Sequence, residues 1–168
     1  MSFSMYEASV PVFKQILNSL SAILDKAESH AADKKIDPQA LLQARLYPDM
    51  FPFLRQVQVA CDFAKGCAAR LAGAEVPRYE DNEKSFADLK ERIERTVAFI
   101  ESLPHDAIEA SEQRDIVTGS GASAREFKGQ VYLVHYAMPH FYFHVTTAYA
   151  LLRHNGVEVG KKDFIGSY

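Results

Sequence analysis

The sequence predicts an all-α protein, an antiparallel four-helix bundle with a small extended or hairpin segment before the last helix. Three observations predict it. Four long stretches carry apolar residues at three- and four-residue steps, each stretch ends near a proline or a glycine, and no repeat or linker divides the chain. With 168 residues, 48% apolar and 24% charged, the chain has the size and composition of one domain spanning residues 1–168.

The first long helix is predicted from Tyr6 to about His30. Pro11 lies close enough to its start to be tolerated. Asp37 followed by Pro38 then predicts a capped start for a short helix that ends near Leu42. The apolar stripe of the first helix consists of Val10, Phe13, Ile16, Leu17, Leu20, Ile23 and Leu24.

The second and third long helices have clearer boundaries. The second is predicted from Asp49 to Leu71, with Gly73 as its C-terminal stop. The third begins at Ser85, which forms a capping box with Asp88 in place of the usual Glu. Pro104 ends it.

The stretch from about Asp115 to Ala137 has a different pattern. Turn residues at 120–123 separate two short segments, which predicts a hairpin that pairs Asp115–Thr118 with Glu126–Gly129. The β-branched and aromatic residues at 131–136 predict a short strand or an extended loop. The fourth long helix is predicted from Pro139 to His154, and the apolar residues of the tail at 157–168 predict packing on the bundle or on a partner.

Charge and composition exclude several classes of function. A net charge of −3 and a pI near 6.1 give no basic surface for nucleic acid or for an anionic membrane. No window is apolar enough for a membrane span, and the first residues lack the pattern of a signal peptide. Cys61 and Cys67 lie on different sides of one predicted helix, so no disulfide joins them, and we place the protein in the cytoplasm.

Two histidines on the last helix are the best candidates for chemistry. His140 and His144 are four residues apart, so both imidazoles leave the same helical face and can converge on one divalent metal ion. The alternative is a pair of inward histidines satisfied by hydroxyl or backbone groups. His135 is an alternative third ligand, and Asp62 could orient a histidine from behind. No phosphate-binding loop or nucleophile elbow occurs, so the sequence identifies no catalytic residue.

Four segments resemble a bacterial family of unknown function that is grouped with the DinB/YfiT-like metalloenzyme superfamily. They are PHFYFHVTTAY at 139–149, LLRHNGV at 151–157, GKKDFIG at 160–166 and QVQVACDFAK at 56–65. The resemblance covers essentially the whole chain.

The resemblance implies a DinB-type bundle, commonly a homodimer, in which three histidines bind a divalent metal such as zinc or nickel. Two of the three match His140 and His144. The third belongs to the second long helix, which here has no histidine and has Gln56 near the matching position. The chain also has Val145-Thr146-Thr147 where the superfamily often has Arg-Gly-Gln.

Three functions follow as hypotheses. The first is a helical bundle that dimerises and binds a small molecule or a metal at the histidine face, with His140, His144 and Gln56 as the metal set. The second is a divalent-metal-dependent enzyme of thiol-transferase or hydrolase type, in which Tyr142 or Asp62 assists. The third is a purely structural dimerisation module. A concave site with convergent polar groups at the histidines would favour the first over the third.

Overall fold

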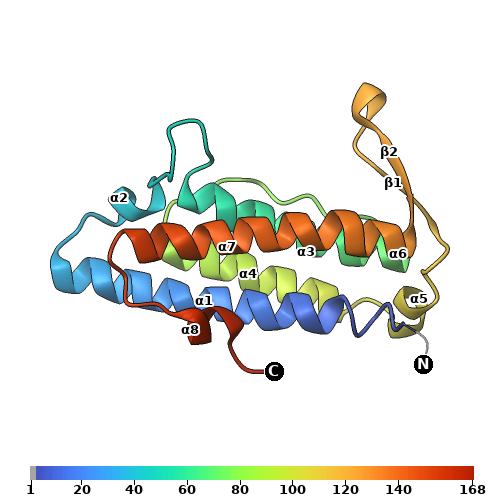
Figure 1. The fold of residues 1–168 in the computed structure, drawn as a ribbon, viewed down its shortest axis with the longest axis horizontal. Coiled ribbons are helices and arrows are strands. Elements are labelled where there is room, and N and C mark those ends of the chain that lie inside the picture. The colour runs from blue at the N-terminus through green and yellow to red at the C-terminus, as the bar shows by residue number, and fades with distance from the viewer. Residues whose placement is uncertain (1–2) are drawn as a thin grey trace.

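The protein is mostly helical, as predicted. The computed structural model describes residues 3–168, and four long helical stretches lie side by side in it (Figure 1). The last stretch is continuous through three segments, of which the middle one is a π-helix. The long stretches are α1 (Val10–Lys34), α3 (Phe53–Ala72), α4 (Phe86–Glu101) and the run of α6 (Gly129–Val131), η2 (Tyr132–Ala137) and α7 (Met138–His154).

Shorter elements connect these helices or cover their ends. They are α2 (Pro38–Leu42), α5 (His105–Glu109), η1 (Gly121–Ser123), α8 (Lys161–Ile165) and the strands β1 (Asp115–Thr118) and β2 (Arg125–Lys128). Helix α8 lies along α1, where Lys26 pairs with Asp163 and Gln15 donates to the Ile165 carbonyl. The prediction that the tail packs on the helices is therefore confirmed.

Helices α1 and α3 each begin four residues later than the predicted starts at Tyr6 and Asp49. Other boundaries follow the local chemistry that predicted them. The Asp37 side chain accepts a hydrogen bond from the Gln39 amide at the start of α2. The Ser85 hydroxyl accepts from the Asp88 amide at the start of α4, whereas the Asp88 carboxylate accepts from the Lys84 amide rather than from the Ser85 amide of the predicted capping box. Gly73 ends α3 with φ of 70°, a conformation that favours glycine.

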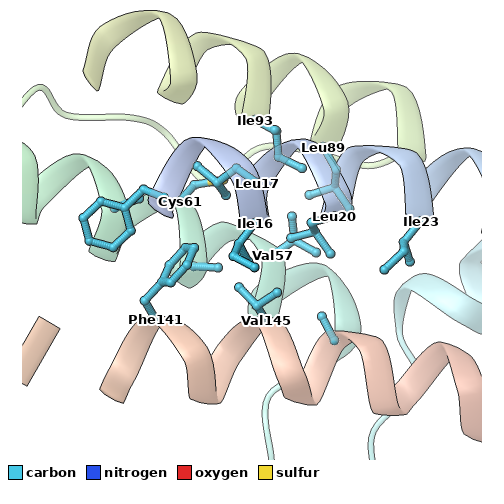
Figure 2. Packing of buried hydrophobic residues seen from close by; sticks show 14 of the residues in the cluster. Ile16, Leu17, Leu20, Ile23, Val57, Cys61, Leu89, Ile93, Phe141 and Val145 are labelled. Atoms are coloured by element: carbon cyan, nitrogen blue, oxygen red, sulfur yellow. The ribbon is translucent and has the colours of Figure 1, made fainter. Parts of the chain in front are cut away.

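The core lies between α1, α3, α4 and α7, where the apolar stripes of these helices meet (Figure 2). Phe141 of α7 is fully buried, and its ring packs edge-to-face on Phe13 of α1 with centroids 4.9 Å apart. Cys61 and Cys67 are both buried and free, as their spacing predicted. None of the helices within residues 3–168 has both the length and the apolarity of a membrane span.

The predicted hairpin is confirmed. Strands β1 and β2 pair antiparallel with Asp115 opposite Lys128 and Thr118 opposite Arg125, so the second strand lies one residue earlier than the predicted Glu126–Gly129 and the pairing register is shifted by one. The hairpin stands away from the helices (Figure 1). Its base is held by Phe127, whose ring packs on the rings of Tyr132 and Tyr136.

The prediction of a strand or extended loop at residues 131–136 is wrong. This segment is the π-helix η2, and it makes the last helix begin at Gly129 rather than at Pro139. The buried residues of this segment are Tyr132 and Leu133, whereas its β-branched residues Val131 and Val134 are exposed. Pro139 has no N–H for the carbonyl of His135, which an α-helix would pair with it, and a wider turn accommodates this loss.

Gly129 is required by a close backbone approach. A Cβ atom at this position would lie 1.9 Å from the carbonyl oxygen of Ser111. Gly129→Ala should therefore lower the free energy of unfolding by about 1–3 kcal/mol, as overpacking does, measured by urea denaturation. Gly66→Ala is the matched control, because a Cβ there meets only the flexible end of the Arg70 side chain. Equal effects of the two substitutions would contradict this explanation.

Candidate functional site at the histidine face

The two histidines of α7 are each held through one ring nitrogen. Nδ1 of His140 lies 2.7 Å from the carbonyl oxygen of Tyr136, one turn earlier. Nδ1 of His144 lies 2.7 Å from the side-chain oxygen of Gln56 on α3, and the Gln56 amide nitrogen donates to the Phe51 carbonyl at 3.1 Å. We call these three side chains, His140, His144 and Gln56, the histidine face.

These contacts fix which nitrogen of each ring carries the proton. A backbone carbonyl only accepts, so Nδ1 of His140 is the donor to Tyr136. The Phe51 carbonyl likewise requires the amide nitrogen of Gln56 on its side, which leaves the Gln56 oxygen facing His144. Nδ1 of His144 is therefore also a donor. In their neutral forms both rings keep the unprotonated lone pair on Nε2.

Aromatic rings surround the two imidazoles. The Phe63 ring on α3 lies nearly parallel to both, with centroids 4.7 Å from His140 and 5.8 Å from His144. Tyr136 packs on His140, and Phe143 meets His144 edge-on. Tyr132, Tyr136, His140 and His144 follow one another at four-residue steps, so they form one stripe along the last helix. The four-residue spacing is visible in the sequence, but the prediction of a strand at 131–136 assigned Tyr132 and Tyr136 to a different element from the histidines.

The pKa of His144 is lowered from its usual value to about 4. The largest cause is burial, which disfavours the charged imidazolium, and the positive charges of His140 and Arg55 act in the same direction. His144 is only 8% exposed. It is therefore neutral at physiological pH, and its Nε2 is available as an acceptor or a ligand.

This lowered pKa predicts a pH-dependent stability. In the unfolded chain the imidazole protonates near its usual pKa, so stability from neutral His144 is complete above about pH 6.5 and falls as the pH drops towards 4. Between about pH 7 and pH 5, unfolding of the wild type should become easier by about 2 kcal/mol more than unfolding of His144→Gln. Urea denaturation at both pH values measures this difference. Equal pH dependence in the two proteins would contradict it.

The other predicted candidates lie elsewhere. His135 is on η2 with an exposed side chain and takes no part in the contacts around His140 and His144. Asp62 pairs with Lys65 and Arg92 rather than with a histidine. Tyr142 is on α7 with a partly exposed side chain, and burial raises its pKa.

The donor set does not fit the three-histidine divalent metal site that the resemblance implies. Within residues 3–168, no three His, Cys, Asp or Glu side chains are grouped closely enough to hold a metal ion. Gln56 lies beside His144, but its oxygen is bonded at Nδ1, on the other side of the ring from Nε2. In this arrangement Gln56 orients His144 from behind, as acceptors behind metal-bound histidines do. Only two strong ligands remain.

A second polar cluster, centred on Arg92 of α4, was not predicted. The Arg92 side chain is 2% exposed, and its guanidinium lies 2.8–3.0 Å from one carboxylate oxygen each of Asp62, Asp81 and Glu83. We call these four residues the Arg92 cluster. Burial alone would lower the pKa of Arg92, but the hydrogen bond with Glu83 and the charge of Asp62 raise it. Since Asp81 and Glu83 belong to the segment between α3 and α4, the cluster ties this segment to both helices.

Further contacts hold the same segment. The Tyr79 ring contacts two cations, the Lys65 ammonium group at 3.8 Å from its centroid and the Arg95 guanidinium at 3.9 Å. Arg55 pairs with Asp81, and Gln58 donates to Glu83. Beneath the cluster, burial raises the pKa of the Cys61 thiol to about 12, so this cysteine is not a reactive thiolate.

Comparison with known proteins supports the fold. The model of a protein family described as a domain of unknown function, DUF1993, matches residues 5–165. The crystal structure of a DinB family member protein from Shewanella denitrificans superposes with a TM-score of 0.91. Its sequence is 40% identical, and the match covers 97% of this chain and 92% of that chain. A search of curated proteins found no match.

Proposed function

The chain belongs to the DUF1993 family of domains of unknown function and is similar to a DinB family member, and we propose that it is a ligand-binding antiparallel four-helix bundle. Its binding site is the histidine face, it works in the cytoplasm, and it assembles as a homodimer. The observation that carries the proposal is the anchoring of both imidazoles through Nδ1, which leaves the Nε2 lone pair of each ring for a small molecule or a metal ion.

Exposed aromatic rings beside the histidine face support binding rather than a purely structural role. Phe51 and Phe143 adjoin the face through Gln56 and His144, and both have about half of their surface exposed. Exposed aromatic residues beside fixed polar acceptors are typical of a site that contacts a ligand or a partner. Surface pockets lie at the Arg92 cluster, beside α1 and at the hairpin rather than at these histidines, so the proposal rests on the exposed rings and the anchored imidazoles and not on a concave site.

Self-association is supported by apolar residues on the outer surface of the last helix. Val131, Val134, Tyr142 and Phe143 are large apolar residues with 39–56% of their surface exposed. Apolar residues gathered on one surface often mark a contact between proteins. A homodimer would cover them on both copies by the same contact.

The second candidate function is a zinc- or nickel-dependent enzyme. The same anchoring favours it, because metal-bound histidines usually donate their other ring nitrogen to a carbonyl or carboxylate oxygen. It needs a ligand beyond the two histidines, since zinc sites in enzymes usually have three protein ligands. We therefore place it second.

Native mass spectrometry on untagged protein, purified without chelators, tests the proposed function. The expected result is a dimer in which each wild-type chain carries a bound small molecule or ion that is absent from His144→Ala. His135→Ala is the matched control, because this exposed histidine lies outside the face. Near-stoichiometric zinc or nickel in the wild type would favour the enzyme instead. An unliganded wild type, also after incubation with zinc and nickel, would overturn the binding function and leave a structural module.

A further inference from the structure

The outer side of the last helix lacks charge. From Gly129 to Leu152 the chain has no Asp, Glu, Lys or Arg, although this run forms a continuous helix at the surface of the bundle. Helix α4, by contrast, carries seven charged residues among its 16. A helix side that faces water is normally charged or polar, whereas the centre of an interface between proteins is poor in charge and rich in aromatic residues and Met. The last helix has the composition of an interface.

The exposed apolar residues of this helix lie on both sides of Met138 along the chain. Val131 and Val134 precede it by seven and four positions, and Tyr142 and Phe143 follow it by four and five. Val134, Met138 and Tyr142 are each about one turn apart and share one side of the helix. A two-fold axis brings such a set against its own copy. An axis at Met138 places Val134 of one copy against Tyr142 of the other, and Val131 near Phe143.

The same axis brings the two ends of the last helix together. The hairpin joins this helix at Gly129, whereas the segment between α2 and α3 lies near His144, because Gln56 contacts both His144 and Phe51. The hairpin and that segment project from the same side of the bundle (Figure 1). Since Gly129 lies nine residues before Met138, the axis places the hairpin base of the second copy opposite the turn that follows His144.

The area of this surface matches what a stable dimer needs. Besides the four exposed residues of the helix, the segment between α2 and α3 contributes Leu46, Tyr47 and Phe51, and the hairpin contributes Val117. With about 150–250 Å² for a whole aromatic side chain, these eight side chains together expose about 700 Å². A standard interface buries about 800 Å² on each partner. An isolated two-stranded hairpin is barely stable in water, so contact with a second copy also stabilises it.

We propose that two copies of the chain pair with their last helices antiparallel around Met138, and that the hairpin of each copy closes the histidine face of the other. This proposal rests on the proposed function, since it adds the second copy to the same binding site. It also explains why the histidine face of a single chain is open while the pockets lie elsewhere, because one wall of the site belongs to the partner. The ligand is therefore held between two chains.

Disulfide cross-linking tests the antiparallel pairing. The double variant Val134→Cys/Tyr142→Cys should become mostly covalent dimer when oxidised with diamide, because each new thiol faces the other one in the second copy. Neither single variant should cross-link appreciably, since identical positions lie about 12 Å apart along the paired helices, beyond the reach of a disulfide. The same spacing excludes a bond within one chain. Cys61 and Cys67 are buried and do not compete. Single variants that cross-link as well as the double variant would overturn the proposal.

Light scattering of the wild type separates a failure of this pairing from a failure of the proposed function. A dimeric wild type whose double variant does not cross-link would overturn the antiparallel pairing and retain the homodimer. A monomeric wild type would overturn this inference together with the homodimer, and native mass spectrometry would still decide whether the single chain binds a ligand.

Histidine acylation tests the closure of the histidine face. Diethyl pyrocarbonate acylates accessible neutral imidazoles, and peptide mass spectrometry gives the rate at each histidine. Tyr142→Arg places a charge in the interface and should give a monomer in which His140 reacts several-fold faster than in the wild type. Ala98→Arg is the matched control, because it adds the same charge at an exposed position of α4 and should stay dimeric with the wild-type rate. The exposed His105 should react equally in all three proteins. A dimeric Tyr142→Arg variant, or equal rates at His140 in dimer and monomer, would overturn the proposal.

Discussion

Arg92→Met should lower the free energy of unfolding by about 3–5 kcal/mol, the usual cost of removing one partner from a buried ion pair. The reason is that Asp62, Asp81 and Glu83 would then face one another without the cation that lies between them. Methionine keeps most of the length of the side chain, so the effect reports lost charge rather than lost volume. Urea denaturation measures it.

The same substitution should release the segment between α3 and α4. Amide hydrogen exchange at residues 79–83 should become faster than in the wild type, while exchange in the core of α1 changes only with global stability. Lys14→Met is the matched control, because the pair of Lys14 with Glu101 is exposed on both sides. Its effect should stay below about 1 kcal/mol. An Arg92 variant as stable as this control would contradict a supporting role of the cluster.

Phe141→Ala should lower the free energy of unfolding by about 3–5 kcal/mol, because it empties a fully buried site in the core. The lost contacts include the edge-to-face packing on Phe13 (Figure 2 shows Phe141 among the core residues). Phe143→Ala is the matched control, since Phe143 lies two residues away on the outer side of the same helix with 56% of its surface exposed. In the monomer this substitution should cost less than about 1 kcal/mol.

Comparable losses for Phe141→Ala and Phe143→Ala, measured by denaturation of both variants, would mean that α7 packs with a different face. A helix turned in this way would also place the buried His144 away from Gln56. The pair of variants therefore checks the helix orientation on which the histidine face depends.

Apolar spacing predicted the long helices because their stability comes from one buried stripe each. Capping chemistry predicted the start of α4 at Ser85, the end of α3 at Gly73 and the start of the short helix α2 at Asp37. Helical spacing predicted that His140 and His144 share one face of the last helix. The family resemblance added Gln56, which lies near the position of the third histidine in that family. The structure places Gln56 and His144 in direct contact.

Two features depended on tertiary structure and could not be predicted from local sequence. Residues 131–136 have the composition of a strand, but packing against the hairpin base and Pro139 determine a π-helix instead. The Arg92 cluster joins residues from α3, α4 and the segment between them. In the sequence, Asp62, Asp81 and Glu83 have no spacing that separates them from ordinary surface carboxylates.

The claim that both imidazoles present an unprotonated Nε2 is tested most directly by long-range ¹H–¹⁵N NMR of the histidine rings. The measurement uses ligand-free wild-type protein at mildly alkaline pH, where the rings are neutral. We expect His140 and His144 to be protonated at Nδ1 and unprotonated at Nε2, as their contacts with Tyr136 and Gln56 require. A proton on Nε2 of either ring would contradict the proposed ligand site.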